Sequence, residues 1–371
     1  MRVHFVGEND DGVSPSTHNA RALGSLGVDV RFDPPSPPVG WRSREWEQTC
    51  RWADVIHVVT YSQCNWMLLR RLWRAGMHGL PIVRYWVGSD CLWARHHAPS
   101  RRFAQALGHL GTLNLAVADH LVEELAQVGV QAATTPVITP NLMLGPCPPP
   151  LPDDFAVLCY LPTRRRAFYG GQVIDRLIER MPDVRFIILA DAETDYSGRE
   201  NVESPGYVED LAATIRRATV HVRPTCHDGM PRLVLEMLSF GRYVIASHPY
   251  PGCHQAAQPE EVERILRRLR RLTQLNLSGR EWVRQHFETA KAAGLLRDQM
   301  QRCLEPGETE LRRAGRRQAA TLLSRCPWML SRRCEPLPTP QDLPKEAAAL
   351  RLALGGEPGL AVSSAEGGPR R

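Results

Sequence analysis

Residues Asp228–Ser247 read DGMPRLVLEMLSFGRYVIAS, and this stretch decides the fold. It opens with an acid and a glycine, continues with Pro231 and an apolar helical pattern, and passes through Gly241 into a β-rich run. Proline is favoured in the first turn of a helix and glycine just past its last turn. The spacing therefore predicts a helix that begins at Pro231 and ends at Phe240, followed by a buried strand.

The same stretch carries groups suited to a nucleotide ligand. The amides of Arg232, Leu233 and Val234 are expected to point out of the first helical turn, where hydrogen bonds and the helix dipole both favour a phosphate. Glu236 lies just over one turn in and can reach a group beside that phosphate, such as a ribose diol. Asp228 precedes the turn and can reach the other side, where a sugar would lie.

The pattern around this stretch predicts two α/β domains. Residues 1–145 alternate β-rich runs with helical patterns, and the alternation restarts over 154–304 after the proline-rich linker 146–153. Such alternation is typical of parallel sheets, which bind ligands at the carboxyl ends of their strands. We therefore expect two Rossmann-like domains facing each other across a cleft. Residues 305–371 are rich in Pro, Gly, Ala and Arg, and we expect a poorly ordered tail.

Composition narrows the class of protein. The chain has 371 residues and a formal charge of +6, and only two of its 46 basic residues, Lys291 and Lys345, are lysines. The positive excess lies between residues 261 and 334 rather than over both domains, which disfavours a nucleic-acid-binding protein. No run is apolar enough to span a membrane, the N-terminus is unlike a signal peptide, and the ten cysteines lack metal-ligand spacing. We expect a cytoplasmic protein.

The Asp228–Ser247 stretch resembles the C-terminal half of retaining family 4 glycosyltransferases of GT-B fold. The family signature is Glu, seven residues and Glu, then a helix, a glycine and a strand. Here the spacing matches, but the first acid is Asp228. The resemblance implies that Glu236 binds the nucleotide ribose and that Asp228 contacts the donor sugar.

Other segments resemble the same family. Tyr160–Gly171, YLPTRRRAFYGG, is similar to the loop that neutralises the donor diphosphate, with Arg164 or Arg165 in the arginine role and Tyr169 where a lysine is usual. Gly206–Asp210 is similar to the turn that lines the base pocket.

The N-terminal half adds two further matches. Gly7–Asn19 is similar to the family's glycine loop near the phosphates. Val87–Asp90, VGSD, resembles an H-G-x-D stretch that faces the reaction centre, with Val87 in place of His. Asp90 is equally well explained as a helix cap. The candidate catalytic residues are thus Asp90, Arg164, Arg165 and Asp228, and the candidate donor-binding residues are Gly12, Tyr207, Val208, Gly229, Arg232, Leu233, Val234 and Glu236.

The resemblance implies an enzyme that transfers a hexose with retention from a nucleotide sugar to a glycan or lipid-linked acceptor, in polysaccharide or glycolipid synthesis. It also implies that neither a metal nor a cofactor is needed. One alternative is a GT-B pseudoenzyme that acts as a binding or scaffold subunit, because Asp228, Tyr169 and Val87 depart from the family pattern. Another is a dinucleotide oxidoreductase, but the first strand lacks a following G-x-G-x-x-G.

Residues 66–80, WMLLRRLWRAGMHGL, allow two interpretations. An amphipathic helix rich in arginine and aromatic residues suits the surface of an anionic membrane, which would place the protein peripherally on the inner face. Alternatively, the helix packs on the sheet with its arginines outward. We favour the second. His18 is expected on the surface of a helix, and His57 inside a buried strand.

Overall fold

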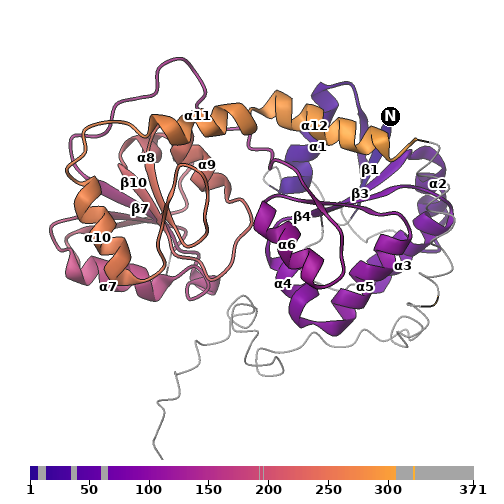
Figure 1. Ribbon diagram of the computed structural model, residues 1–371, viewed down its shortest axis with the longest axis horizontal. Helices are drawn as coiled ribbons and strands as arrows, with labels where there is room; N and C mark the ends of the chain where they lie inside the picture. Colours follow the sequence, from indigo (N-terminus) through magenta and orange to yellow (C-terminus); the bar gives the residue numbers. More distant parts are fainter. Residues whose placement is uncertain are drawn as a thin grey trace, which may run out of the picture.

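The computed structural model of the protein describes residues 1–6, 14–34, 40–59, 66–191, 193, 194, 196–305 and 321. It contains two six-stranded sheets in two lobes that lie side by side (Figure 1). Every strand pair in both sheets is parallel. The predicted pair of α/β domains is confirmed.

The first sheet has the strand order β2-β1-β3-β4-β5-β6. Its central strands are buried on both faces, as expected for a parallel sheet covered by helices. The strands are β1 (Arg2–Val6), β2 (Asp29–Phe32), β3 (Val55–Val59), β4 (Ile82–Trp86), β5 (Leu113–Ala116) and β6 (Ala133–Thr134). The helices are α1 (Pro15–Ser25), α2 (Arg44–Trp52), α3 (Trp66–Met77), α4 (Ser89–His96), α5 (Ala98–His109) and α6 (Asp119–Gln127).

The second sheet has the order β12-β11-β10-β7-β8-β9, so β10 and β7 lie at its centre. The strands are β7 (Ala156–Tyr160), β8 (Arg185–Leu189), β9 (Val202–Gly206), β10 (Val220–Arg223), β11 (Tyr243–Ala246) and β12 (His254–Gln255). The helices are α7 (Gly171–Arg180), α8 (Leu211–Arg216), α9 (Arg232–Ser239), α10 (Pro259–Leu269) and α11 (Leu277–His286), with a short 3₁₀ turn, η1, at Thr163–Arg165.

Helix α12 (Thr289–Arg302) returns to the first domain and lies beside α1 (Figure 1). Its Gln299 side chain accepts a hydrogen bond from Thr135 Oγ1 at 3.0 Å, and Gln299 is buried. The expected domain boundaries place residues 154–304 together in the second domain. The structure instead divides them, because the apolar face of α12 is buried against the first lobe.

Two arginines of the second domain bind the linker and the residues just before it. Arg242 is fully buried, and its Nη atoms donate to the carbonyls of Pro149 at 3.1 Å and Pro150 at 2.7 Å. Arg280 donates to the carbonyls of Met143 and Gly145. Residues 135–155, all of them described, form neither helix nor strand. Since proline cannot donate a backbone hydrogen bond, these side chains supply the linker carbonyls with partners.

Helix α3 packs into the first domain, as the favoured interpretation expects, but its arginines do not all point outward. Arg71 is buried and donates to both carboxylate oxygens of Asp33, at 2.7 and 2.5 Å. The pKa of Asp33 falls to about 2 because hydrogen bonds from His4 and Arg71 outweigh the effect of burial. Arg74 pairs with Glu47. Two of the three arginines on this helix, Arg71 and Arg74, are therefore committed to ion pairs within the first domain.

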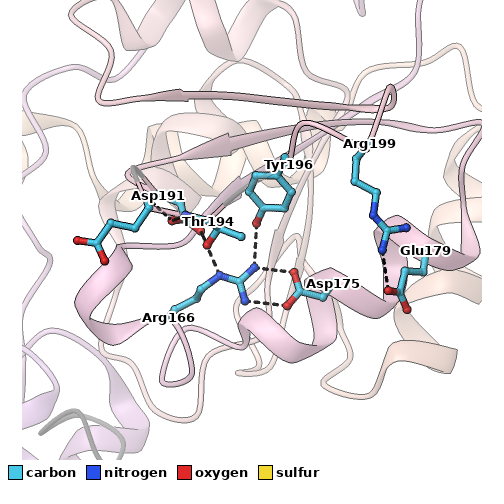
Figure 2. A network of polar contacts seen from close by, with 8 residues as sticks. Arg166, Asp175, Glu179, Asp191, Thr194, Tyr196 and Arg199 are labelled. Carbon is cyan, nitrogen blue, oxygen red and sulfur yellow. Dashed lines mark hydrogen bonds and ion pairs between the residues drawn. The ribbon is translucent and has the colours of Figure 1, made fainter.

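Ala190, directly after β8, has a φ of +66°. It precedes the loop between β8 and β9, and Arg166 holds this loop in place. Arg166 donates to Asp191 through Nε at 3.1 Å, to Asp175 through Nη1 at 2.7 Å and to the Tyr196 hydroxyl at 2.8 Å (Figure 2). The left-handed region costs an alanine roughly 1–2 kcal/mol. The Arg166 network thus holds a strained turn at the carboxyl end of β8.

We expect Ala190→Gly to stabilise the protein by about 0.5–1 kcal/mol, because relief of the left-handed conformation exceeds the entropic cost of a glycine. Denaturant unfolding of wild type and variant measures this. Ala246→Gly in β11, where φ is negative, is the control and should destabilise by about 1 kcal/mol. Equal destabilisation by both substitutions would contradict the inference that the backbone at Ala190 is strained.

Candidate functional site

The candidate site lies at the carboxyl ends of β7 and β10, the two central strands of the second sheet. Residues Pro224–Pro231 connect β10 to α9, and residues Leu161–Gly170 connect β7 to α7. The carboxyl ends of parallel strands are where open α/β sheets bind ligands. Both connections carry residues that the sequence singled out.

Asp228 is held in place by three hydrogen bonds. Its Oδ2 accepts from Arg223 Nε at 2.5 Å, and its Oδ1 accepts from the amide of Gly229 at 3.0 Å. Its backbone carbonyl lies 2.8 Å from Nε2 of His120, on α6 of the first domain. Arg223 is a partner that the sequence analysis missed, although a charged residue at the end of a buried strand was a visible signal.

Gly229 brings the two domains into backbone contact. A Cβ at Gly229 would lie 2.1 Å from the carbonyl oxygen of Val87, and a Cβ at Gly88 would lie 2.9 Å from the amide nitrogen of Gly229. Gly88 also has a φ of +142°. Only glycine fits at these two positions, so the VGSD stretch of the first domain directly faces the Asp228 loop.

Asp90 acts as a brace for this stretch. Its carboxylate accepts hydrogen bonds from the amides of Gly88 at 2.9 Å, Cys91 at 3.0 Å and Val87 at 3.2 Å. Burial raises the pKa of the Asp90 carboxyl to about 6, although these amide bonds lower it. Asp90 is the second residue of α4, whose N-cap is Gly88 without a side-chain cap bond, so Asp90 is not the cap residue. Both of its carboxylate oxygens accept from backbone amides, and its catalytic role stays a prediction.

The first turn of α9 differs slightly from the prediction. Pro231 is the N-cap residue rather than the first helical residue, with φ −71° and ψ 128°. The amides of Arg232 and Leu233 have no acceptor among the described residues. The amide of Val234 donates to the Pro231 carbonyl at 3.1 Å, so its expected role toward a ligand is wrong. Two amides, not three, remain for an anion.

Glu236 is buried without a hydrogen-bond partner. Its exposed fraction is 7%, and its carboxylate bonds to no described residue. Burial raises the pKa of Glu236, and the nearby Arg232 guanidinium opposes that rise. A buried carboxylate without partners is costly for the fold, which is typical of a group kept for a ligand.

The three arginines that follow β7, Arg164, Arg165 and Arg166, differ in their exposure and in their contacts. Arg165 lies over the ring of Phe168 at 4.8 Å, and its Nη2 reaches Ser89 Oγ of the first domain at 3.4 Å. Its Nε is buried with no acceptor among the described residues. Arg164 is exposed, and Arg166 is committed to the network described above. Of the two candidates for the diphosphate arginine, Arg165 alone contacts the facing domain.

The chain is similar in fold to known proteins. The family model described as "Glycosyl transferases group 1" matches residues 165–273. The structure of Anabaena Alr3699/HepE in complex with UDP-glucose has 14% identity and a TM-score of 0.59, covering 81% of this chain and 99% of that one. Sucrose-phosphate synthase from Thermosynechococcus elongatus has 15% identity and a TM-score of 0.60, covering 82% and 99%. A glycosyltransferase from Rickettsia africae has 10% identity and a TM-score of 0.60, covering 82% and 98%. No curated protein matches the chain.

The fold is GT-B. The expected fold class is therefore confirmed. The matched residues 165–273 lie in the second GT-B domain and include Arg165, Asp228 and Glu236.

The remaining candidates lie around this domain's strand ends. Tyr207 follows Gly206, whose φ is +70°, and its side chain is 81% exposed, while Val208 is half-buried. Gly12 lies outside the described residues, as does most of the Gly7–Asn19 loop. The described part of that loop begins at Ser14, which caps α1 by accepting from the Thr17 amide.

Histidines join the two GT-B domains beside the site. His18 is buried rather than on the surface, and Nη1 of Arg232 lies 2.9 Å from its Nδ1. His227 Nε2 lies 2.9 Å from the carboxylate of Glu124 on α6. These contacts depend on how the domains meet, so spacing along the chain gave no signal for them.

The described residues lack both a membrane-spanning helix and a metal-binding cluster. None of their helices is both long and apolar enough to cross a membrane. Within the same residues, no group of three or more His, Cys, Asp or Glu side chains is arranged to hold a metal ion.

Proposed function

We propose that the chain is a glycosyltransferase that moves a hexose with retention from a nucleotide-sugar donor to a glycan or lipid-linked acceptor. The observation that carries the proposal is the buried, unpartnered Glu236 carboxylate behind the free amides of Arg232 and Leu233. A carboxylate accepts the two hydroxyls of a ribose, and helix amides with the dipole favour the adjoining phosphates. Both ligand groups occur together in a nucleoside diphosphate.

The reaction breaks the bond between the anomeric carbon and the diphosphate oxygen, and forms a bond from that carbon to an acceptor oxygen on the same face. Negative charge builds on the departing diphosphate, so preorganised donors accelerate departure. We assign this role to Arg165 and the α9 amides. Tyr207 and Val208 are assigned to the base, and Asp228 to the donor sugar. We assign no cofactor or metal to the reaction.

The comparisons supply the first donor to test. Anabaena Alr3699/HepE was solved with UDP-glucose, and the model matched over residues 165–273 is described as glycosyltransferase. We therefore propose UDP-sugars as the first class in a thermal-shift screen that continues with GDP-, ADP- and dTDP-sugars. A ligand at 100 times its Kd stabilises by about 2.7 kcal/mol. The proposed setting is polysaccharide or glycolipid synthesis in the cytoplasm, with peripheral contact at the inner face of the membrane.

We expect Glu236→Gln to weaken binding of the nucleoside diphosphate by about 10–100-fold, because a hydrogen bond to a charged group contributes about 1.5–3 kcal/mol. Calorimetric titration measures this. The melting temperature above pH 5 should stay the same or rise, because burial raises the pKa of Glu236 and the ionised carboxylate therefore destabilises the fold. A lower melting temperature with unchanged binding would show a structural role and contradict the proposal.

A second candidate is a GT-B pseudoenzyme that binds nucleotide sugars without transferring them. The observation that favours it is the ion pair between Asp228 and Arg223, which occupies the carboxylate assigned to the donor sugar. Purified protein that binds a nucleotide sugar, yet neither hydrolyses it nor transfers the sugar to any acceptor in a glycan and lipid panel, would support this alternative.

A further inference from the structure

Arg223 is a buried cation at the centre of the site. It ends β10, and because Val222 pairs with Cys159 of β7, Arg223 is level with Tyr160 at the end of the neighbouring strand. Only 9% of Arg223 is exposed. Arginine is rarely buried to this extent unless it is paired or reserved for a ligand.

Asp228 accepts a hydrogen bond from only one of the three nitrogens of this guanidinium. Nε donates to Asp228 Oδ2 at 2.5 Å, and the guanidinium carbon lies 5.2 Å from the centre of the Tyr169 ring. The other two nitrogens, which carry four of the five N–H donors, have no acceptor among the described residues. Neither nitrogen is completely enclosed by the protein, so a ligand can reach both of them. The Asp228 carboxylate raises the pKa of Arg223, although burial lowers it, and the group stays charged.

Two helix N-termini flank the loop that follows Arg223. The next residue, Pro224, touches the N-cap of α7, since a Cβ at Gly170 would lie 2.2 Å from the Pro224 carbonyl oxygen. On the other side, Asp228 leads through Gly229 into α9. Helix N-termini and a guanidinium attract the same class of ligand, a phosphate.

We propose that Arg223 is a second phosphate-binding cation that donates to the β-phosphate of the nucleoside diphosphate, opposite Arg165. Asp228 then orients the guanidinium through Nε and leaves its outer edge for the ligand. The proposal rests on the proposed function. It explains why an acid assigned to the donor sugar is held by a buried arginine.

The test compares binding of UDP and UMP, or of the matching pair for the base that the thermal-shift screen selects. Wild type should bind the diphosphate at least 10-fold more tightly than the monophosphate. Arg223→Gln should lose 10-fold or more in diphosphate affinity and less than 3-fold in monophosphate affinity. Arg223→Lys should keep most of the preference. Arg176→Gln on the exposed face of α7 is the matched control, with no change expected.

A charge-relocation variant sharpens the test. Because the Tyr169 ring lies 5.2 Å from the guanidinium, a lysine at that position can bring an ammonium to the same phosphate. Arg223→Gln combined with Tyr169→Lys should therefore recover at least 5-fold of the lost diphosphate affinity. Where Arg223→Gln alone fails to fold by circular dichroism, the double variant Arg223→Gln/Asp228→Asn removes both charges and takes its place.

The two proposals fail separately. A folded Arg223→Gln protein that keeps the diphosphate preference overturns the role of Arg223 and leaves the proposed function standing. A wild-type protein that binds none of the nucleotides overturns the proposed function and, with it, this inference.

Discussion

Replacing Arg165 by alanine is expected to lower the rate of sugar transfer by about 10²–10³-fold, the usual effect of losing one preorganised donor to a developing negative charge. The reason is the place of Arg165 between the domains: Nη2 reaches Ser89, and Nε is buried with no acceptor in the described part of the chain. The measurement is initial-rate transfer at saturating donor, which isolates kcat from donor affinity.

Arg164→Ala is the matched comparison for this prediction. Arg164 is the neighbouring residue and carries the same charge, but it is exposed. Its loss should cost less than tenfold. If Arg164→Ala had the larger effect, the arginine that binds the diphosphate would be Arg164. If the single variants Arg165→Ala and Glu236→Gln both kept near-normal turnover, the assignment of this site would be contradicted.

Replacing Arg242 by alanine is expected to destabilise the second domain by about 2–5 kcal/mol, the range for truncating a large buried side chain to alanine. Arg242 is fully buried, and its guanidinium donates to Pro149 and Pro150 and, at 3.4 Å, to Ile215 and Arg216. Its loss removes the side-chain donor to the carbonyls of Pro149, Pro150 and Arg216, whereas Ile215 keeps the bond from the Ala218 amide, and it opens a cavity. Chemical denaturation monitored by tryptophan fluorescence and circular dichroism measures the loss, with two transitions allowed for the two domains.

Arg264→Ala on α10 is the control for Arg242. Arg264 is exposed, so the free energy of unfolding should change by no more than about 0.5 kcal/mol. Equal effects of the two substitutions would mean that the linker is not held by Arg242.

The sequence predicted those features that depend on local spacing. The strand–loop–helix–strand pattern around Asp228 and Glu236 predicted an α/β domain, because proline, glycine and apolar periodicity act over a few residues. The resemblance of this stretch to family 4 glycosyltransferases implied the GT-B fold. It also narrowed the diphosphate arginine to two neighbours. Choosing between them required the facing residue Ser89, which is 76 positions away from Arg165.

Features built by distant parts of the chain were beyond the sequence. Arg223 and Asp228 are only five residues apart, but their pairing depends on where β10 ends. The burial of His18 and the partner of Arg71 follow from packing between elements that are separated in the chain. The amide of Val234 was assigned to a ligand because first-turn amides are usually free, whereas here it closes a 3₁₀-type bond to Pro231.

The return of α12 to the first lobe has a consequence for synthesis on the ribosome. Residues 289–302 are made after the whole second domain, yet they cover α1, at the start of the chain. The first domain therefore emerges with part of its apolar surface bare, and it is completed only when the second domain has already been made. Domains usually fold as separate units from the N-terminus onward. In this chain the core of the first domain is completed only after α12 has been synthesised. A fragment that stops at the proline linker therefore lacks part of its own core.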